Sequence, residues 1–309
     1  MRAQLISAQG REFDLPALFS CVLSHTQGLP CSAFSLRCPY DRTMLPALES
    51  AAYCRVLYEG ATVFYGPVDD FEIGQGRGGM SVSISGRGLA ALLIDNQAEA
   101  AQFSFVTLQD ILQRYVLPYG IRDIVSAQLR PVSNFSVPGG SSLWDALCAF
   151  TQASGGITPR FSGEGRLIIS QGGGAPRSIS ESSGVINLKY LKKRYGILSE
   201  VVVQRTDGFS LTVKNNEYIA CGGRRRRIIT VPASTDELAM RQLASERIES
   251  SKAKKSLISL SLPGLFRAEA GDIVELSLTR PGLFGRYRVS EACTNYGDRC
   301  YTTLELIKE

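Results

Sequence analysis

The sequence predicts a mainly β protein in which two similar β-barrel domains flank a small α/β domain. The first observation is a pattern of strands and glycine turns that occurs twice, over residues 54–88 and again over residues 271–306. In each copy the middle strand opens near an aromatic residue and a glycine, Phe64-Tyr65-Gly66 in one and Phe284-Gly285 in the other. The second observation is helical periodicity between the copies, which indicates an α/β insert. Three chains with two barrel-like modules each could therefore build a ring of near-sixfold shape.

The expected domains follow from length and composition. A chain of 309 residues is too long for one ordinary hydrophobic core, so we expect two or three domains. The divisions are a first β-barrel over residues 1–95, a small α/β domain over residues 96–185 and a second β-barrel with one helix over residues 186–309. In the first barrel, residues 81–85 alternate serine with apolar residues, which indicates a strand with one buried face.

Capping signals mark two helices in the middle domain. Thr107 and Asp110 have the spacing of a capping box, although Asp replaces the usual Glu or Gln. Pro118 is expected to end the helix that follows. A second helix should begin after Ser142 and end at Gly155-Gly156, since glycine is favoured just beyond a helix.

The rest of the middle domain is predicted from turn residues. Trp144, in the first turn of the second helix, is expected in the core rather than on a ligand platform. A hairpin is expected around residues 163–165, and residues 171–176 resemble an exposed loop or linker. Together these elements would complete a small α/β domain.

The last domain is expected to contain strands and one helix. Ser234 and Glu237 have capping-box spacing at the start of that helix. Its predicted apolar positions are Leu238, Leu243, Ala244 and Ile248. Its C-terminal end is basic, which suits the helix dipole, with lysines at positions Lys252, Lys254 and Lys255. Strands are expected at residues 199–205, 257–262, 273–278, 287–294 and 301–307.

The sequence assigns no catalytic, cofactor-binding or metal-ligating residue. The eight cysteines form no CxxC pair, and the single histidine, His25, has no constellation of cysteine, serine or carboxylate tied to it. Most thiols are expected to be reduced and buried. Cys293 and Cys300 flank a hairpin at Gly297 and could face each other across its strands. We expect no enzyme activity and no cofactor.

Two further motifs are interpreted as surface features. Residues 74–79 are rich in glycine, but they lack the GxxxxGK[ST] pattern and precede a strand, so we expect a hairpin tip rather than a phosphate loop. Contact with a neighbouring subunit could order this tip. Asp69 and Asp70 are adjacent on a strand and point to opposite faces, so they cannot join Glu72 in one acid–base site. A solvated barrel rim is expected there.

Charge is distributed unevenly along the chain. Residues 1–100 carry −3 and the remainder +8, which suits different partners at the two ends. The strongest cluster is Arg224 to Arg227. Three interpretations stay open: a solvated edge protected from strand pairing by charge, contact with an acidic partner or the inner wall of a ring, and nucleic-acid binding. The last lacks an aromatic platform in the sequence. No apolar window is long enough for a membrane anchor.

These motifs, in this order, resemble the baseplate hub proteins of contractile phage tails and phage-tail-like bacteriocins. That family includes the hub of phage Mu, the N-terminal part of VgrG and late control protein D. The resemblance covers nearly the whole chain. It is carried by residues 64–69 with 82–90, by residues 107–112 with 118–120, and by residues 140–147 running into 161–167.

The resemblance implies a homotrimer whose two tube-like barrels alternate around a channel. Such a ring would join the hexameric tail tube, or a tube-initiator protein, to the trimeric spike, with tape-measure and baseplate wedge proteins as further partners. It would be assembled in the bacterial cytoplasm and reside in the virion or tail-like particle, where nucleic acid only passes through the channel. Ser81, Ser83 and Ser85 would suit a wet channel wall.

Two competing functions remain. One is a tail-tip enzyme that degrades cell wall, and the other is a nucleic-acid-binding adaptor that uses Arg224 to Arg227. Because the chain ends at Glu309 directly after its last expected strand, we expect lytic activity to come from a separate protein.

Overall fold

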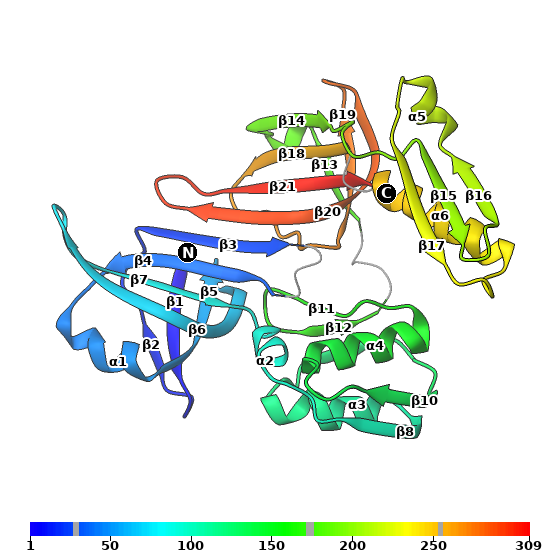
Figure 1. Cartoon of the computed structure of the whole chain (residues 1–309). Coiled ribbons are helices and arrows are strands. Elements are labelled where there is room, and N and C mark those ends of the chain that lie inside the picture. Colours follow the sequence, from blue (N-terminus) through cyan, green and yellow to red (C-terminus); the bar gives the residue numbers. More distant parts are fainter. Residues whose placement is uncertain (27–30, 171–175, 253–255) are drawn as a thin grey trace. The chain divides into compact units, whose positions relative to one another are not determined.

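The computed structural model of the chain describes residues 1–26, 31–170, 176–252 and 256–309 (Figure 1). Contacts divide it into two compact units, the first made of residues 1–188, 260–307 and 309, and the second of residues 189–259 and 308. Most of the expected loop at residues 171–176, together with Lys254 and Lys255, lies outside the described residues. No helix in the described part of the chain has the length and apolar character needed to span a membrane.

The first unit begins with a β module built on alternating burial. Its strands are β1 (Arg2–Ser7), β2 (Glu12–Asp14), β3 (Ser20–Thr26), β4 (Ala33–Pro39), β5 (Ala51–Tyr58), β6 (Ala61–Gly76) and β7 (Gly79–Arg87). Two short helices, η1 (Arg42–Met44) and α1 (Leu45–Ser50), separate β4 from β5. Val82 and Ile84 are fully buried, as the alternation in β7 predicts. The rings of Phe34 and Phe64 pack in this core with centroids 5.1 Å apart.

A small α/β part follows, and its capping boxes are confirmed. Its elements are α2 (Ala91–Ile94), β8 (Ala101–Val106), α3 (Leu108–Tyr115), η2 (Leu117–Tyr119), β9 (Ile124–Ser126), β10 (Val132–Val137), α4 (Leu143–Gly155), β11 (Arg160–Phe161) and β12 (Leu167–Ile169). The Thr107 N–H donates to the Asp110 carboxylate at 2.8 Å, and the Asp110 N–H donates to the Thr107 hydroxyl at 3.3 Å. Ser142 and Asp145 repeat this exchange at the start of α4. Trp144 is buried in the core, as expected.

A second β module, which resembles the first, lies mostly in the first unit, while its residues 189–192, 256–259 and 308 are assigned to the second unit. Its elements are β13 (Arg177–Ser180), η3 (Glu181–Ser183), β14 (Asn187–Lys192), β18 (Ser256–Pro263), β19 (Ile273–Leu278), β20 (Leu283–Tyr296) and β21 (Tyr301–Lys308). In both modules a long middle strand, β6 or β20, pairs with different neighbours along its two halves. β6 pairs with β5 up to Pro67 and with β7 from Val68 onward. β20 pairs with β19 up to Arg288 and with β3 from Glu291 onward.

The strand order makes the repeat explicit. The large sheet runs β14-β18-β21-β20-β3-β4-β7-β6-β5-β1-β2, with β19 and β13 branching from β20. The order β14-β18-β21-β20 therefore repeats as β3-β4-β7-β6. The two copies are joined inside the chain by antiparallel pairing of β20 with β3. The strand pattern seen at both ends of the sequence corresponds to β5, β6 and β7 in the first module and to β19, β20 and β21 in the second.

The repeat is incomplete, and the sheet is open. β1 pairs with β5 in antiparallel orientation, whereas β13 pairs with β19 in parallel. In the described residues β2 and β14 stand at the two ends of the sheet without a second neighbour. The mainly β fold is present, but neither module closes into a barrel within the described residues. The two-barrel arrangement expected from the sequence is therefore not confirmed.

The second unit is a small α/β sandwich within residues 186–309, the span expected to form the second barrel. Its elements are β15 (Glu200–Arg205), β16 (Ser210–Lys214), α5 (Asn216–Ala220), β17 (Arg226–Val231) and α6 (Glu237–Lys252). The sheet order is β16-β15-β17, with β15 and β17 parallel. Helix α6 packs Met240, Ala244 and Ile248 against Val201 and Val203 of β15.

Two details of α6 differ from the sequence prediction. Asp236, rather than Ser234, caps the helix, since its carboxylate accepts the Ala239 N–H at 2.7 Å. Leu238 is 68% exposed, whereas Met240 is fully buried. Met240, Ala244 and Ile248 recur at four-residue spacing and so share the helix face that packs on the sheet, whereas Leu238 lies off that face.

Candidate functional site

The lone histidine lines a cavity of about 480 Å³ in the first unit. His25 lies on β3, and its ring centroid is 6.2 Å from that of Phe64. Arg160, at the start of β11, and the acidic residues Glu269 and Asp272, just before β19, line the same cavity. Residues more than 200 positions apart in the sequence therefore meet here, which no local sequence signal indicates.

The carboxylates of this cavity accept hydrogen bonds from Arg160 and from backbone N–H groups. The Arg160 Nη1 atom donates to Asp272 Oδ1 at 3.2 Å and lies 3.9 Å from Glu269 Oε2. The Gly163 N–H donates to Glu269 Oε1 at 2.6 Å, and the Glu269 N–H donates to Asp272 Oδ2 at 3.1 Å. These contacts tie the β11–β12 hairpin to the loop before β19.

Burial shifts the protonation of two groups in the cavity. It lowers the pKa of His25 to about 4, and the nearby Asp272 carboxylate opposes this only in part. Burial also raises the pKa of Glu269 above its usual range, with the Gly163 N–H acting in the opposite direction. His25 is therefore neutral at pH 7.

The cavity does not contain the hydrogen bonds that nucleophilic catalysis needs. In the described residues, no hydrogen bond joins His25 to a serine, threonine or carboxylate, as a nucleophile and its base would require. The described part of the chain also holds no group of three His, Cys, Asp or Glu side chains placed to bind a metal ion. What the contacts do accomplish is to fix one part of the first unit against another.

The glycine-containing turn of the β11–β12 hairpin is fixed by hydrogen bonds on both sides of Gly163. The Tyr65 N–H of β6 donates to the Gly163 carbonyl at 2.8 Å. A Cβ atom at Gly163 would lie 2.5 Å from the Val63 carbonyl and 3.0 Å from His25 Cε1, so only glycine fits. The turn thus contacts the first β module through β6 and the second through Glu269.

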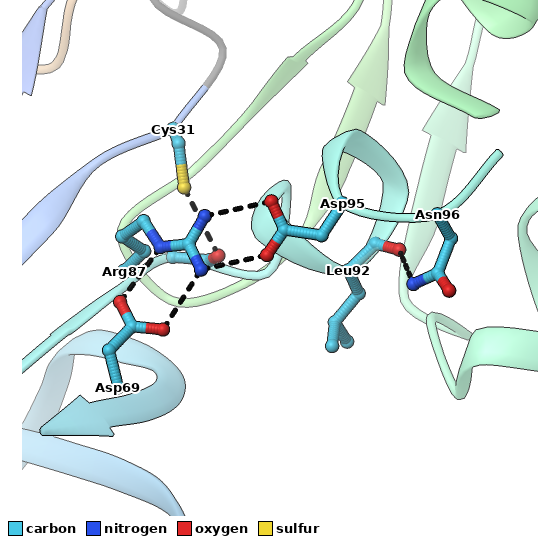
Figure 2. A network of polar contacts seen from close by, with 7 residues as sticks. Cys31, Asp69, Arg87, Leu92, Asp95 and Asn96 are labelled. Carbon is cyan, nitrogen blue, oxygen red and sulfur yellow. Dashed lines mark hydrogen bonds and ion pairs between the residues drawn. The ribbon is translucent and has the colours of Figure 1, made fainter. Parts of the chain in front are cut away.

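A second junction, which we call the Arg87 network, joins the first module to the α/β part (Figure 2). The Arg87 guanidinium donates to both oxygens of Asp69 on β6, at 2.7 and 2.9 Å. It also donates to both oxygens of Asp95, just after α2, at 3.0 and 2.7 Å. The Cys31 thiol donates to the Gly88 carbonyl beside it, at 3.4 Å. These bidentate bonds hold the pKa of the Asp95 carboxyl below its usual range.

The acidic pair expected at a solvated rim divides between two environments. Asp69 belongs to the Arg87 network, because an irregularity in the β6–β7 register between Val68 and Asp70 turns it toward Arg87. Asp70 and Glu72 are exposed. The glycine-rich stretch is the β6–β7 hairpin tip, as predicted from the absence of a following helix.

The structure also shows where the alternating serines of β7 and the eight cysteines lie. Ser81 is 6% exposed and accepts hydrogen bonds from Arg37, whereas Ser83 and Ser85 are half-buried. A channel-facing role for these serines stays a prediction. All eight cysteines are free thiols, and Cys293 and Cys300 are half-buried.

Besides β2 and β13, β14 and the later half of β6 lack a second strand neighbour in the described residues. The later half of β6, from Asp70 to Gln75, pairs with β7 on one side only. β14 ends the sheet and is bonded to β18 alone. Tyr190 and Leu191 of β14 are 49% and 40% exposed, and Phe71 of β6 is 37% exposed.

These two edges carry opposite charges. The free edge of β6 presents the exposed carboxylates of Asp70 and Glu72, whereas β14 presents the exposed ammonium groups of Lys189 and Lys192.

Comparison with solved structures finds this fold in tail proteins. The chain is similar to a tail protein from Neisseria meningitidis, with 17% identity, a TM-score of 0.75, and 99% of this chain and 95% of that one covered. It is similar to the 43 kDa tail protein of prophage MuSo2 from Shewanella oneidensis, with 18% identity, a TM-score of 0.77, and coverage of 100% and 98%.

A more distant likeness extends to secretion systems. A component of the E. coli type VI secretion system, described as similar in structure to the phage T4 tail proteins gp27 and gp5, matches with 11% identity and a TM-score of 0.58 over 94% of this chain and 73% of that one. No protein-family model and no curated protein matches the chain. The resemblance to tail hub proteins inferred from the sequence is confirmed at the level of the fold.

Proposed function

We propose that this chain, which has the fold of phage tail proteins, is a structural baseplate hub of a phage tail or tail-like particle. Three copies form a ring of near-sixfold shape that joins the hexameric tail tube to the trimeric spike. The observation that carries this proposal is the repeated strand order β3-β4-β7-β6 and β14-β18-β21-β20, since two equivalent modules per chain give six modules in a trimer.

The strand pairing that joins the two modules within one chain predicts which strands pair between neighbouring chains. β20 of the second module pairs with β3 of the first through Glu291 to Tyr296. By the repeat, the equivalent residues of β6 are Asp70 to Gln75, and the strand equivalent to β3 is β14. The free edge of β6 therefore pairs with β14 of the next copy. This contact is head to tail, and in a ring of three it closes and leaves neither edge open.

Charge supports the same pairing. Asp70 and Glu72 share one face of β6, whereas Lys189 and Lys192, three positions apart, lie on opposite faces of β14. One of these lysines would therefore share a face with the two carboxylates, where opposite charges are favourable cross-strand neighbours. The same edges would repel their own kind, so that β6 would not pair with a second β6. The exposed Tyr190 and Leu191 would be covered by the neighbour.

The partners and the place of action follow from this architecture. The ring would contact a tail tube or tube-initiator protein on one side and a central spike protein on the other, with tape-measure and wedge proteins as further neighbours. It would act as part of the particle, after assembly in the bacterial cytoplasm. Its role is to hold positions rather than to catalyse a reaction, in keeping with junctions built from the Arg87 network and the β11–β12 turn.

Electron cryo-microscopy of the tail particle tests this proposal. We expect density for three copies of the chain between the last tube ring and the spike, with β6 of one copy beside β14 of the next. Density for the chain elsewhere in the particle, or in a number that is not a multiple of three, would refute the hub assignment.

A further inference from the structure

The arginine run of the second unit lies on an open strand edge. β17 is the outer strand of the sheet β16-β15-β17, so one of its sides has no strand neighbour in the described residues. Arg226 and Arg227 begin this strand, and Ile228 beside them is 58% exposed. An unpaired edge of this kind can accept an extended peptide as an added strand.

A cavity of about 470 Å³ opens beside the start of β17. It is lined by Arg225, Arg226 and Arg227, and by Arg247 from the later part of α6, with Ser250 and Ser251 next to it. Arg226 has a carboxylate partner, Glu200 on β15. In the described residues neither Arg227 nor Arg247 has one. The cavity therefore concentrates more positive charge than the unit itself neutralises.

Local contacts fix this arginine run in place. The Ser199 hydroxyl accepts the Arg225 N–H at 2.5 Å and donates to the Arg225 carbonyl at 2.7 Å. The Arg225 guanidinium lies over the ring of Tyr195, 5.0 Å from its centroid. A guanidinium held in position loses less conformational freedom when it binds a carboxylate.

We propose that this cavity and the free edge of β17 bind an acidic, extended segment of a partner protein as an added strand. Successive side chains of β17 point to opposite faces, so Arg227 lies on the face toward α6 and Ile228 on the other. An added strand whose side chains alternate acidic and apolar would place its carboxylates near Arg227 and Arg247 and its apolar groups near Ile228. This docking site is separate from the ring-forming edges.

Nucleic acid fits the site less well. Tyr195 is 87% exposed, so the run does have an aromatic neighbour that the sequence did not reveal. However, Arg225 already lies over this ring, and Arg205 lies over Phe209, 4.7 Å from the ring centroid. Single-stranded nucleic acid is usually held by bases stacked on free aromatic faces, whereas carboxylates need only the guanidinium groups.

A synthetic peptide tests the proposal. The probe is a fluorescent eight-residue peptide of alternating aspartate and valine, titrated with the full chain and followed by fluorescence anisotropy. We expect Arg227→Ser and Arg247→Ser each to weaken binding by about tenfold, since each removes charged hydrogen bonds. Arg241→Ser is the matched control, because Arg241 lies on α6 outside the cavity and pairs with Glu237 at 2.8 Å. It should leave binding unchanged.

Two further arms separate strand addition from attraction by charge alone. The same peptide with N-methylated backbone amides cannot form a strand ladder and should bind at least tenfold more weakly. Hydrogen exchange of β17 amides should slow when the unmodified peptide is bound. Equal binding of both peptides, an equal loss in Arg241→Ser, or tighter binding of a twelve-nucleotide oligothymidine with the same arginine dependence would overturn the proposal.

Discussion

Gly66→Ala is expected to destabilise the chain by about 3 kcal/mol or more, the largest effect of any single methyl group in the first unit. A Cβ atom at this position would lie 2.0 Å from the Arg87 carbonyl oxygen and 2.7 Å from the Gly88 Cα atom. Both are backbone atoms, so no side chain can rotate away. The approach is reciprocal, because a Cβ atom at Gly86 would lie 2.1 Å from the Pro67 carbonyl. β6 passes here from pairing with β5 to pairing with β7.

Urea unfolding followed by circular dichroism measures this effect. Gly74→Ala is the matched control, since Gly74 lies on the same strand and a Cβ atom there would meet nothing within 4 Å. It should change the free energy of unfolding by less than about 0.5 kcal/mol. If the two variants differ by less than about 1 kcal/mol, the close approach of β6 to β7 does not exist in solution.

Acid should destabilise the chain through His25, whose pKa is lowered by burial in the folded chain. Burial lowers the pKa of His25 to about 4 in the folded chain, whereas in the unfolded chain the imidazole has its ordinary pKa of 6.5. The unfolded chain therefore binds more protons between these values, and stability must fall as the pH falls through that window. At pH 5 the loss should be about 2 kcal/mol relative to pH 7.5.

The variant His25→Gln isolates this contribution, because His25 is the only histidine in the chain. Glu269 and Asp272 line the same cavity and are unchanged in both proteins. From pH 7.5 to pH 5 the unfolding free energy of the unaltered chain should therefore fall by about 2 kcal/mol more than that of the variant. Parallel pH profiles for the two proteins would mean that His25 is solvated in the folded state.

The parts of the fold that depend on short spacing were predictable from the sequence. The capping boxes at Thr107 and Ser142 are local exchanges between residues three positions apart, and the structure contains both. The alternation that buries Val82 and Ile84 is equally local. The repeated strand, turn and strand pattern gave the relation between the two modules, although it could not reveal that their sheets join through β3 and β20.

The Arg87 network and the contacts of Arg160 join residues far apart in the chain, so no short sequence spacing predicts them. Asp69 turns toward Arg87 because the register shifts near it, and a register shift depends on the neighbouring strand rather than on the sequence of β6 alone. Arg160 and Asp272 lie 112 positions apart and meet only after three parts of the first unit have packed. The valine-rich strand β15 was expected in the second barrel because it has the pattern of a barrel strand, whereas its parallel pairing with β17 depends on tertiary contacts.

The mass of the native species tests the central claim, that two repeated modules let three copies close a ring through β6 and β14. Native mass spectrometry should give three times the 33.6 kDa mass of the chain. Two double variants reverse the charge of one edge each, Asp70→Lys with Glu72→Lys and Lys189→Glu with Lys192→Glu, and each should dissociate the trimer. A chain that carries all four changes has the charges of the two edges exchanged and should form the trimer again. A monomer, dimer or tetramer of the unaltered chain would contradict the claim.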